Sequence, residues 1–336
     1  MITKRTRRRS YAVSALALAG ALALAGCGSV TESADDGDSS DRIDQLKIIV
    51  PADPGGGWDA TGREMQSVLQ DNDLVGNAQV ENVGGAGGTI GLARLANERE
   101  ENTLMVMGMV MVGAVETNQS AATLEDVTPV AALTEESLII VAPAKSPYET
   151  VDDLVADLEK RGQGVSIAGG SAGGADHILA GLLLQNAGIE PKGLNYIPYS
   201  GGGESLAALL GGKVSAGISG VAEYASQVES GKLKALAVSG EERSELLPDV
   251  PTLAEQGVDV TLTNWRGVVA PGNIDEDKAD QLTQLVTDMH DTDDWATVLE
   301  DNAWADAFVS GDDFGTFMDE EITRIQTVLR DIGLVE

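Results

Sequence analysis

The sequence predicts an α/β protein with mainly parallel sheets, and two features of the chain support this prediction. Short apolar runs typical of buried strands alternate with amphipathic patterns typical of helices along most of the chain. Four clusters of glycines each lie between the end of a predicted strand and the start of a predicted helix. With 336 residues, 43% of them apolar, the chain is long enough for two domains of roughly 150 residues each.

The pattern begins at Leu46, where a strand is followed by a glycine-rich turn and a helix, and this unit is then repeated. A further helix begins after Thr150, because Thr150 and Asp153 have the spacing of a capping box. In this half the predicted strands are 46–50, 79–83, 103–107 and 137–142, and the predicted helices lie near 59–70 and 88–97.

The second half continues the alternation and ends in two helices. The last helix has an apolar stripe, and Gly333 is placed to cap its C-terminus. The stripe consists of Phe314, Phe317, Met318, Ile325, Val328, Leu329 and Ile332. The predicted strands lie near 164–168, 194–198, 214–218, 233–238 and 265–270, with helices at 174–186 and 203–211 between them.

The N-terminal segment 1–26 has the pattern of an export signal. A cluster of basic residues precedes an apolar stretch that is too short to span a bilayer comfortably. The stretch ends at Leu24-Ala25-Gly26-Cys27, which resembles the lipobox of bacterial lipoproteins, so we expect lipidation of Cys27; a chance free cysteine is the alternative. The Arg8-Arg9 pair leaves general and twin-arginine export both open. Residues 27–44 are acidic and rich in Ser and Gly, which predicts a disordered linker.

The charge and cysteine content exclude several classes of function. The chain has 22 Lys and Arg against 54 Asp and Glu, a net charge of −32, which argues against nucleic-acid binding. One cysteine excludes a disulfide framework and a multi-Cys zinc site, and two histidines leave little for a metal centre. We interpret the scattered acids as an adaptation for solubility or salt, with a dedicated cation site as the alternative.

The glycine clusters are the features most indicative of function. Helix starts expose unpaired N–H groups, glycine lets the backbone approach a ligand, and ligands of open α/β sheets bind beyond the carboxyl ends of the strands. Such turns suit an anion held by short-range donors, whereas tight turns without function are the alternative. A phosphate-binding P-loop and a dinucleotide fingerprint both fit poorly. The clusters are Gly55–Gly57, Gly84–Gly88, Gly169–Gly174 and Gly201–Gly203.

Segments 50–59 and 81–91 resemble the two binding loops of the tripartite tricarboxylate transporter substrate-binding (Bug) family. The Gly55-Gly56-Gly57-Trp58-Asp59 form is closest to its tricarboxylate-binding branch. The resemblance covers roughly residues 46–335, and Met-rich 105–111 departs from it. We interpret this methionine run as a core strand leading into a loop, with copper binding as the alternative. Further similar segments follow in family order at 174–177, 196–202, 231–238, 247–252 and 265–271.

This resemblance implies a two-lobed periplasmic-binding-protein clamshell of type II-like form, with two crossover strands. One lobe would comprise 45–140 and 268–336, and the other 141–267. Arg266 would pair with a distal carboxylate, although a salt bridge to a protein acid is equally compatible. His177 and Trp58 have structural alternatives, and Asp59 is expected to organise its loop. The ligand-binding residues that the resemblance implies are Gly55, Gly56, Gly57, Trp58, Gly87, Gly88, Thr89, Ser171, Ala172, Gly173, His177 and Arg266.

The resemblance further implies a receptor without catalytic residues, cofactor or metal. It would be a monomer on the outer face of the membrane that delivers a carboxylate, favouring a citrate-like tricarboxylate, to a permease of one large and one small integral subunit. Whether a divalent cation accompanies the ligand stays open. One alternative is a lipid-anchored enzyme acting on a carboxylated substrate, with Asp59, Asp176 or Glu204 as its base. Another is a sensor-coupled binding protein.

Overall fold

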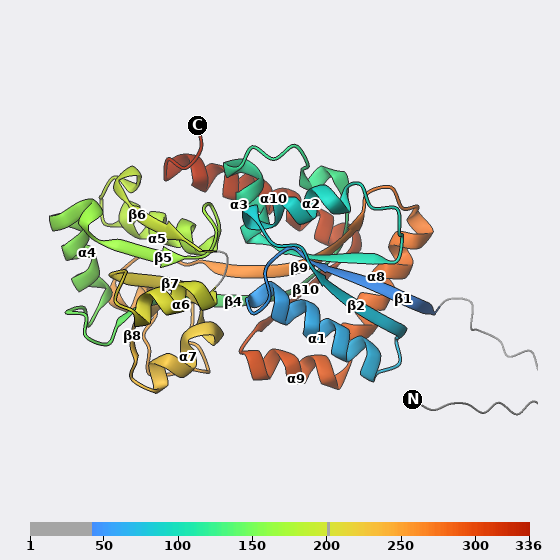
Figure 1. Ribbon diagram of the computed structural model, residues 1–336, viewed down its shortest axis with the longest axis horizontal. Coiled ribbons are helices and arrows are strands. Elements are labelled where there is room, and N and C mark those ends of the chain that lie inside the picture. Colours follow the sequence, from blue (N-terminus) through green and yellow to red (C-terminus); the bar gives the residue numbers. More distant parts are fainter. Residues whose placement is uncertain (1–41, 200–201) are drawn as a thin grey trace, which may run out of the picture. The chain divides into compact units, whose positions relative to one another are not determined.

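The computed structural model describes residues 42–199 and 202–336, all within one packed unit (Figure 1). The predicted signal peptide 1–26, Cys27 and most of the predicted linker lie outside these residues. The first strand begins at Ile43, which is buried and pairs with Val75. The linker prediction therefore ran two residues too far, because the apolar side chain of Ile43 already belongs to the core.

The strands of the described residues form a ten-stranded sheet with two halves that share one strand. In half-sheet A, β2 pairs in parallel with β1 and β1 with β3, whereas β9, β4 and β10 join by antiparallel pairing. Its strands are β1 (Ile43–Val50), β2 (Val75–Asn82), β3 (Thr103–Gly108), β4 (Val127–Pro143), β9 (Thr263–Pro271) and β10 (Ala305–Ser310).

Half-sheet B is built on the end of β4. There β5 pairs in parallel with β6 and β7, and β4 pairs antiparallel with β7 and β8. Its other strands are β5 (Ser166–Gly169), β6 (Asn195–Pro198), β7 (Ala216–Gly220) and β8 (Leu233–Val238). Parallel pairing thus occurs where strand–helix–strand units repeat, and antiparallel pairing involves the long strands β4 and β9.

β4 crosses between the halves, as one of the two predicted crossover strands should, whereas β9 pairs only within half-sheet A. β4 pairs with β9 up to Ser137 and with β7 from Leu138 onwards. The sequence predicted only 137–142 of this strand, because Pro129 and the acids Glu135 and Glu136 interrupt the apolar pattern of its first part. In the structure these residues belong to β4, and the side chain of Glu136 lines the cavity described below.

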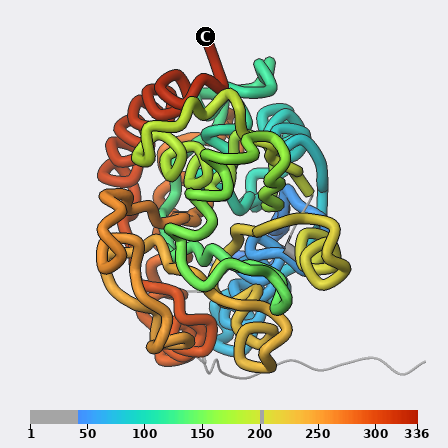
Figure 2. The backbone as a smooth tube through the Cα atoms, turned by 90° about the vertical axis from the view of Figure 1, so that its left-hand side faces the viewer, coloured from blue at the N-terminus to red at the C-terminus, as the bar shows by residue number. Residues whose placement is uncertain are grey.

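The helices flank both halves of the sheet. Besides short 3₁₀ turns, they are α1 (Gly57–Asp71), α2 (Thr89–Leu95), α3 (Met109–Thr117), α4 (Val151–Arg161), α5 (Ala175–Asn186), α6 (Gly202–Leu210), α7 (Val221–Glu229), α8 (Glu276–His290), α9 (Asp293–Asn302) and α10 (Gly311–Asp331). α10 contacts α3 and β4, and in Figure 2 it is the dark red segment leading to the C-terminus. No helix within 42–199 or 202–336 is both long and apolar enough to cross a bilayer.

The predicted caps of α4 and α10 are confirmed. Thr150 and Asp153 form the reciprocal capping box of α4, and Gly333 follows α10 with φ of 74°. The prediction that the methionine run ends in a loop was wrong, because α3 begins at Met109. Met109 and Met111 are both buried. A short helix that is apolar on all sides has no periodicity to distinguish it from a buried strand.

Candidate ligand-binding site

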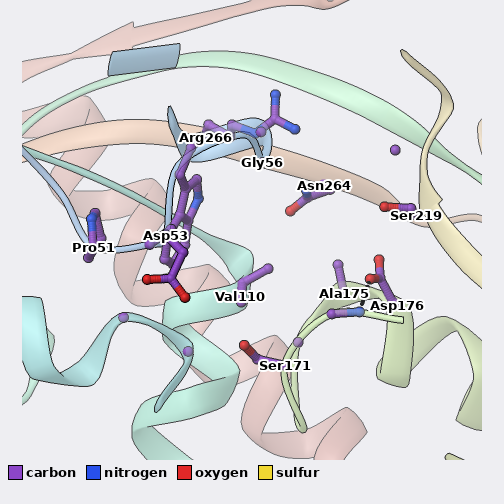
Figure 3. A pocket seen from close by; sticks show the side chains of 18 of the residues that line it. Pro51, Asp53, Gly56, Val110, Ser171, Ala175, Asp176, Ser219, Asn264 and Arg266 are labelled. Carbon is purple, nitrogen blue, oxygen red and sulfur yellow. Dashed lines mark hydrogen bonds between the residues drawn. The ribbon is translucent and has the colours of Figure 1, made fainter. Parts of the chain in front are cut away.

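A cavity of about 120 Å³ lies where loops of the two half-sheets meet (Figure 3). The loops after β1 and β2 and the start of α3 line one side. The loops after β5 and β7 line the other, and β4 and β9 contribute side chains between them. The lining residues are Pro51, Ala52, Asp53, Gly56, Gly57, Trp58, Gly85–Gly88, Val110, Glu136, Gly170, Ser171, Gly174–Asp176, Ser219, Gly220, Glu223, Asn264 and Arg266.

The loop after β1 is held by Asp59, as predicted. Its Oδ2 accepts hydrogen bonds from the Gly55 N–H at 3.0 Å and Arg63 Nε at 2.9 Å, and its Oδ1 accepts one from Asn82 Nδ2 at 2.8 Å. Burial raises the pKa of Asp59, but these three hydrogen bonds outweigh burial and keep the pKa below its ordinary value. Asp59 is therefore committed to positioning the loop.

The loop after β2 depends on glycine for its shape. Gly87 and Gly88 have φ of 62° and 92°, and a Cβ on Gly87 would come within 2.5 Å of the Ala114 Cβ. A Cβ on Gly88 would meet the ring of Trp58 at 2.8 Å. Substitution here would disturb the backbone itself, so these glycines are required by the fold whatever they bind.

The opposite side of the cavity is acidic. Asp176, at the start of α5, is partly buried and accepts a hydrogen bond from the Gly170 N–H at 2.6 Å. Burial raises the pKa of Asp176 to about 7, and the charges of Glu223 and Glu136 add to this shift. Burial likewise raises the pKa of Glu223, whose Oε2 accepts a hydrogen bond from the Ser219 hydroxyl at 3.0 Å.

Arg266 on β9 forms a buried ion pair with Glu136 on β4. The two side chains are only 3% and 4% exposed. Arg266 also lies over the ring of Trp304, 5.0 Å from its centroid, and Asn264 Nδ2 donates to Glu136 Oε1 at 3.4 Å. Of the two interpretations of Arg266, the structure shows the salt bridge to a protein acid; its Nη1 has no partner among the described residues.

The cavity brings together seven of the residues implied by the family resemblance. The seven are Gly56, Gly57, Trp58, Gly87, Gly88, Ser171 and Arg266. The remaining five do not line it: Gly55, Thr89, Ala172, Gly173 and His177. Of the fourth glycine cluster, position 201 lies outside the described residues.

His177 has a structural environment. Its Nδ1 accepts a hydrogen bond from the Gly173 N–H at 3.2 Å, and its ring stacks on Tyr196 with centroids 4.0 Å apart. Burial lowers the pKa of His177 to about 4, so the ring is neutral at ordinary pH. Nδ1 and one face of the ring are therefore already used, and ligand contact by His177 stays a prediction.

Sequence reasoning did not assign ligand contact to Glu136, Asp176, Ser219, Glu223 or Asn264, which all line the cavity. Three of them could have been found by position. Ser219 and Glu223 follow the predicted strand near 214–218, and Asp176 follows the one near 164–168, at the carboxyl ends where ligands bind. Glu136 and Asn264 are on β4 and β9, for which the sequence offered no such rule.

Asp176 should make the protein less stable as pH rises from about 4 to about 7. Its folded pKa, about 7, lies above the unfolded value of 3.8, so the folded state binds more protons throughout this window. Stability is then fully present at the acidic end and is lost as pH rises through the folded pKa, by up to about 4 kcal/mol. Glu223 acts in the same direction.

Urea unfolding of the parent and of Asp176→Asn between pH 5 and pH 8 measures this contribution as the difference between the two proteins, and the stability of the variant relative to the parent should rise with pH. The difference is needed because His177, whose folded pKa of about 4 lies below its ordinary value of 6.5, contributes a slope of the opposite sign below about pH 6.5 in both proteins. Equal slopes in the variant and the parent would show that the Asp176 carboxyl does not titrate in this window.

The sheet and cavity define a class of protein. Two lobes that share β4, with a cavity between their loops, form the clamshell of periplasmic binding proteins. Residues 63–334 match the tripartite tricarboxylate transporter family receptor, and the chain belongs to this family.

Two comparisons of sequence agree with this membership. The chain is 30% identical over 303 residues to Protein BugT of Bordetella pertussis, covering 86% of this chain and 89% of that protein. It is 32% identical over 231 residues to a protein of Agrobacterium vitis encoded in the TAR-I ttuE-ttuC' intergenic region, covering 67% of this chain and 65% of that protein.

Solved structures share the fold. The periplasmic binding protein BugD has a TM-score of 0.78 at 22% identity, covering 87% of this chain and 98% of that one. MatC of Rhodopseudomonas palustris, solved with bound malate, has a TM-score of 0.74 at 24% identity, covering 85% and 99%. Another R. palustris protein, solved with adipate, has a TM-score of 0.79 at 22% identity, covering 88% and 99%.

Proposed function

We propose that this receptor captures a small carboxylate between lobes 45–140 plus 268–336 and 141–267, and hands it to a two-subunit membrane permease. The observation that carries the proposal is the pair of glycine loops after β1 and β2, which end at the starts of α1 and α2 and face the second half-sheet across the cavity. Backbone N–H groups at a helix start suit a carboxylate. The bound malate and adipate of two structural relatives support the same ligand class.

Ligand binding would act on the hinge formed by β4 and β9. The change in pairing partner of β4 between Ser137 and Leu138 supports lobe boundaries near those proposed. A ligand that touches both sides of the cavity binds the closed form better than the open form, and so shifts the population toward it. The permease would recognise that closed form, and the receptor would release its ligand chemically unchanged.

A citrate-like tricarboxylate is the ligand that the sequence favours, but the lining counts against three negative charges. Asp176 and Glu223 are partly buried acids on the side where a distal carboxylate would lie, and Arg266 is already paired with Glu136. Like charges repel strongly in a poorly solvated site. We therefore propose a carboxylate as the ligand, without specificity for a tricarboxylate.

A thermal-shift screen of the purified protein against mono-, di- and tricarboxylates, with and without magnesium, tests the proposal. We expect at least one acid to stabilise the protein, by about 2.7 kcal/mol when present at 100 times its Kd. The bound acid should be recovered unchanged, whereas turnover would favour the enzyme alternative. If no acid shifts the melting temperature, the proposed function is wrong.

We further propose that the receptor is a monomer held on the outer face of the membrane by lipid on Cys27. The lipobox-like Leu24-Ala25-Gly26-Cys27 carries this proposal. Cys27→Ser should move the protein from the membrane fraction to the soluble fraction and remove the acyl mass from the N-terminal peptide. If the protein stayed in the membrane fraction, lipid on Cys27 would not be what holds it there.

A further inference from the structure

We infer that the ligand is a compact zwitterion, with its carboxylate at the glycine loops and a positively charged, proton-donating group against Asp176, Glu223 and Asn264. This inference rests on the proposed function and narrows its ligand class. The carboxylate-binding loops alone do not distinguish a dicarboxylate from an amino carboxylate. The charged and polar groups on the opposite side of the cavity distinguish these two kinds of ligand.

The first argument is the charge of the lining. Asp53, Glu136, Asp176 and Glu223 carry carboxyl groups, and Arg266 is the only cationic side chain among the described lining residues. Arg266 is paired with Glu136 inside the protein. The cavity therefore presents the partly buried acids Asp176 and Glu223, which form no ion pair among the described residues although the charge of Arg266 lowers the pKa of both. A second ligand carboxylate there would meet charges of its own sign.

The second argument is an unpartnered acceptor. Asn264 is only 9% exposed, and its Oδ1 has no hydrogen-bond partner among the described residues. Its Nδ2 donates to Glu136 Oε1 at 3.4 Å, which sets the orientation of the amide. Figure 3 shows the Asn264 oxygen directed into the space near Val110 and Ala175. A buried acceptor without a donor is costly, so the ligand is expected to supply an N–H.

The space between the two ends suits a short hydrocarbon. Trp58, Val110 and Ala175 line it with apolar surface. Burial and the charges of Glu223 and Glu136 hold the pKa of Asp176 high, and the charge of Arg266 offsets them only in part. An ammonium group on the ligand would provide further positive charge, and a short aliphatic spacer would separate it from the carboxylate.

Calorimetric titration of the purified protein with matched pairs tests the inference. Each pair shares one carbon skeleton with and without an ammonium group, namely alanine with propionate and 4-aminobutyrate with butyrate; succinate and citrate, with and without magnesium, complete the set. We expect the ammonium-bearing member of at least one pair to bind about tenfold or more tightly than its partner, and more tightly than succinate or citrate.

Variants of the acidic side identify the cause. Asp176→Asn and Glu223→Gln should each reduce the affinity ratio within that pair to about twofold or less. Glu125→Gln, which removes an exposed acid away from the cavity, controls for the overall charge of the protein and should leave the ratio unchanged. The comparison of pairs in the parent protein stands even if a variant does not fold.

Three results would overturn the inference. The first is a ratio near one in both pairs, and the second is tighter binding of succinate or citrate, with or without magnesium, than of either ammonium compound. The third is a preference for the ammonium compound that persists in both cavity variants. If succinate or citrate binds in these cases, the proposed function survives and only the zwitterion fails; if no acid binds, both are wrong.

Discussion

Gly56→Val should abolish ligand binding, by a factor of at least about 100, and leave the free protein about as stable as before. Gly56 lines the cavity, and a Cβ on it would meet nothing within 4 Å. Its φ of −103° and ψ of 178° are an extended conformation that valine adopts readily. The isopropyl group would therefore occupy the space of the ligand without straining the loop.

The melting temperature with and without a stabilising ligand measures this effect. Gly55→Val is the matched control, because Gly55 also has open space around a Cβ but does not line the cavity, and its φ of 95° disfavours valine. That variant should lose stability in the free protein by about 1–3 kcal/mol. If Gly56→Val instead destabilised the free protein as much as Gly55→Val, the glycine would serve the turn and not the ligand.

Arg266→Met should destabilise the protein by about 3–5 kcal/mol, because it leaves Glu136 buried without its counter-charge. The nearby acids Asp176 and Glu223 make this loss harder to compensate. Urea unfolding at pH 8 measures the change. The double variant Arg266→Met/Glu136→Gln should regain much of the loss, since both charges are then absent.

Arg94→Met provides the comparison at the surface. Arg94 pairs with Glu81, and the two side chains are 39% and 46% exposed. Solvent screens such a pair, so its loss should cost less than about 1 kcal/mol. If Arg266→Met were as mild as Arg94→Met, the buried pair would contribute little to joining β9 with β4, and solvent access to the cavity would be the reason.

Local patterns predicted most elements near their observed places. The capping box of α4, the apolar stripe of α10 and the glycine turns each depend on residues close together in the chain, so the sequence alone specifies them. α3 and β10 were not predicted, α7 was expected only as an unplaced helix between strands, and two closing helices were predicted where the structure has three, α8, α9 and α10. α3 lacks amphipathic periodicity because it is buried on all sides, and only packing against its neighbours distinguishes it from a strand.

The part of the cavity that the glycine loops line was also predictable from residues close together in the chain. The carboxyl ends of parallel strands meet at one edge of a sheet, so the positions of Gly56, Gly87 and Ser171 followed from local order. The structural environment of His177 was not predictable in this way, because its stacking partner Tyr196 comes from a different element, β6. The spacing of residues within one segment does not show which ring of another segment will stack on a side chain.

The sequence by itself determined the family, most of the strands and helices, and the loops whose backbone faces the cavity, because these depend on neighbouring residues. Only the tertiary structure decided the electrostatics of the site. Glu136 and Arg266 are 130 residues apart yet form one buried pair. Asp176 and Glu223 come from the starts of two separate helices, α5 and α7, to face the same space. Charge in a cavity depends on which distant side chains share it, and only folding brings them together.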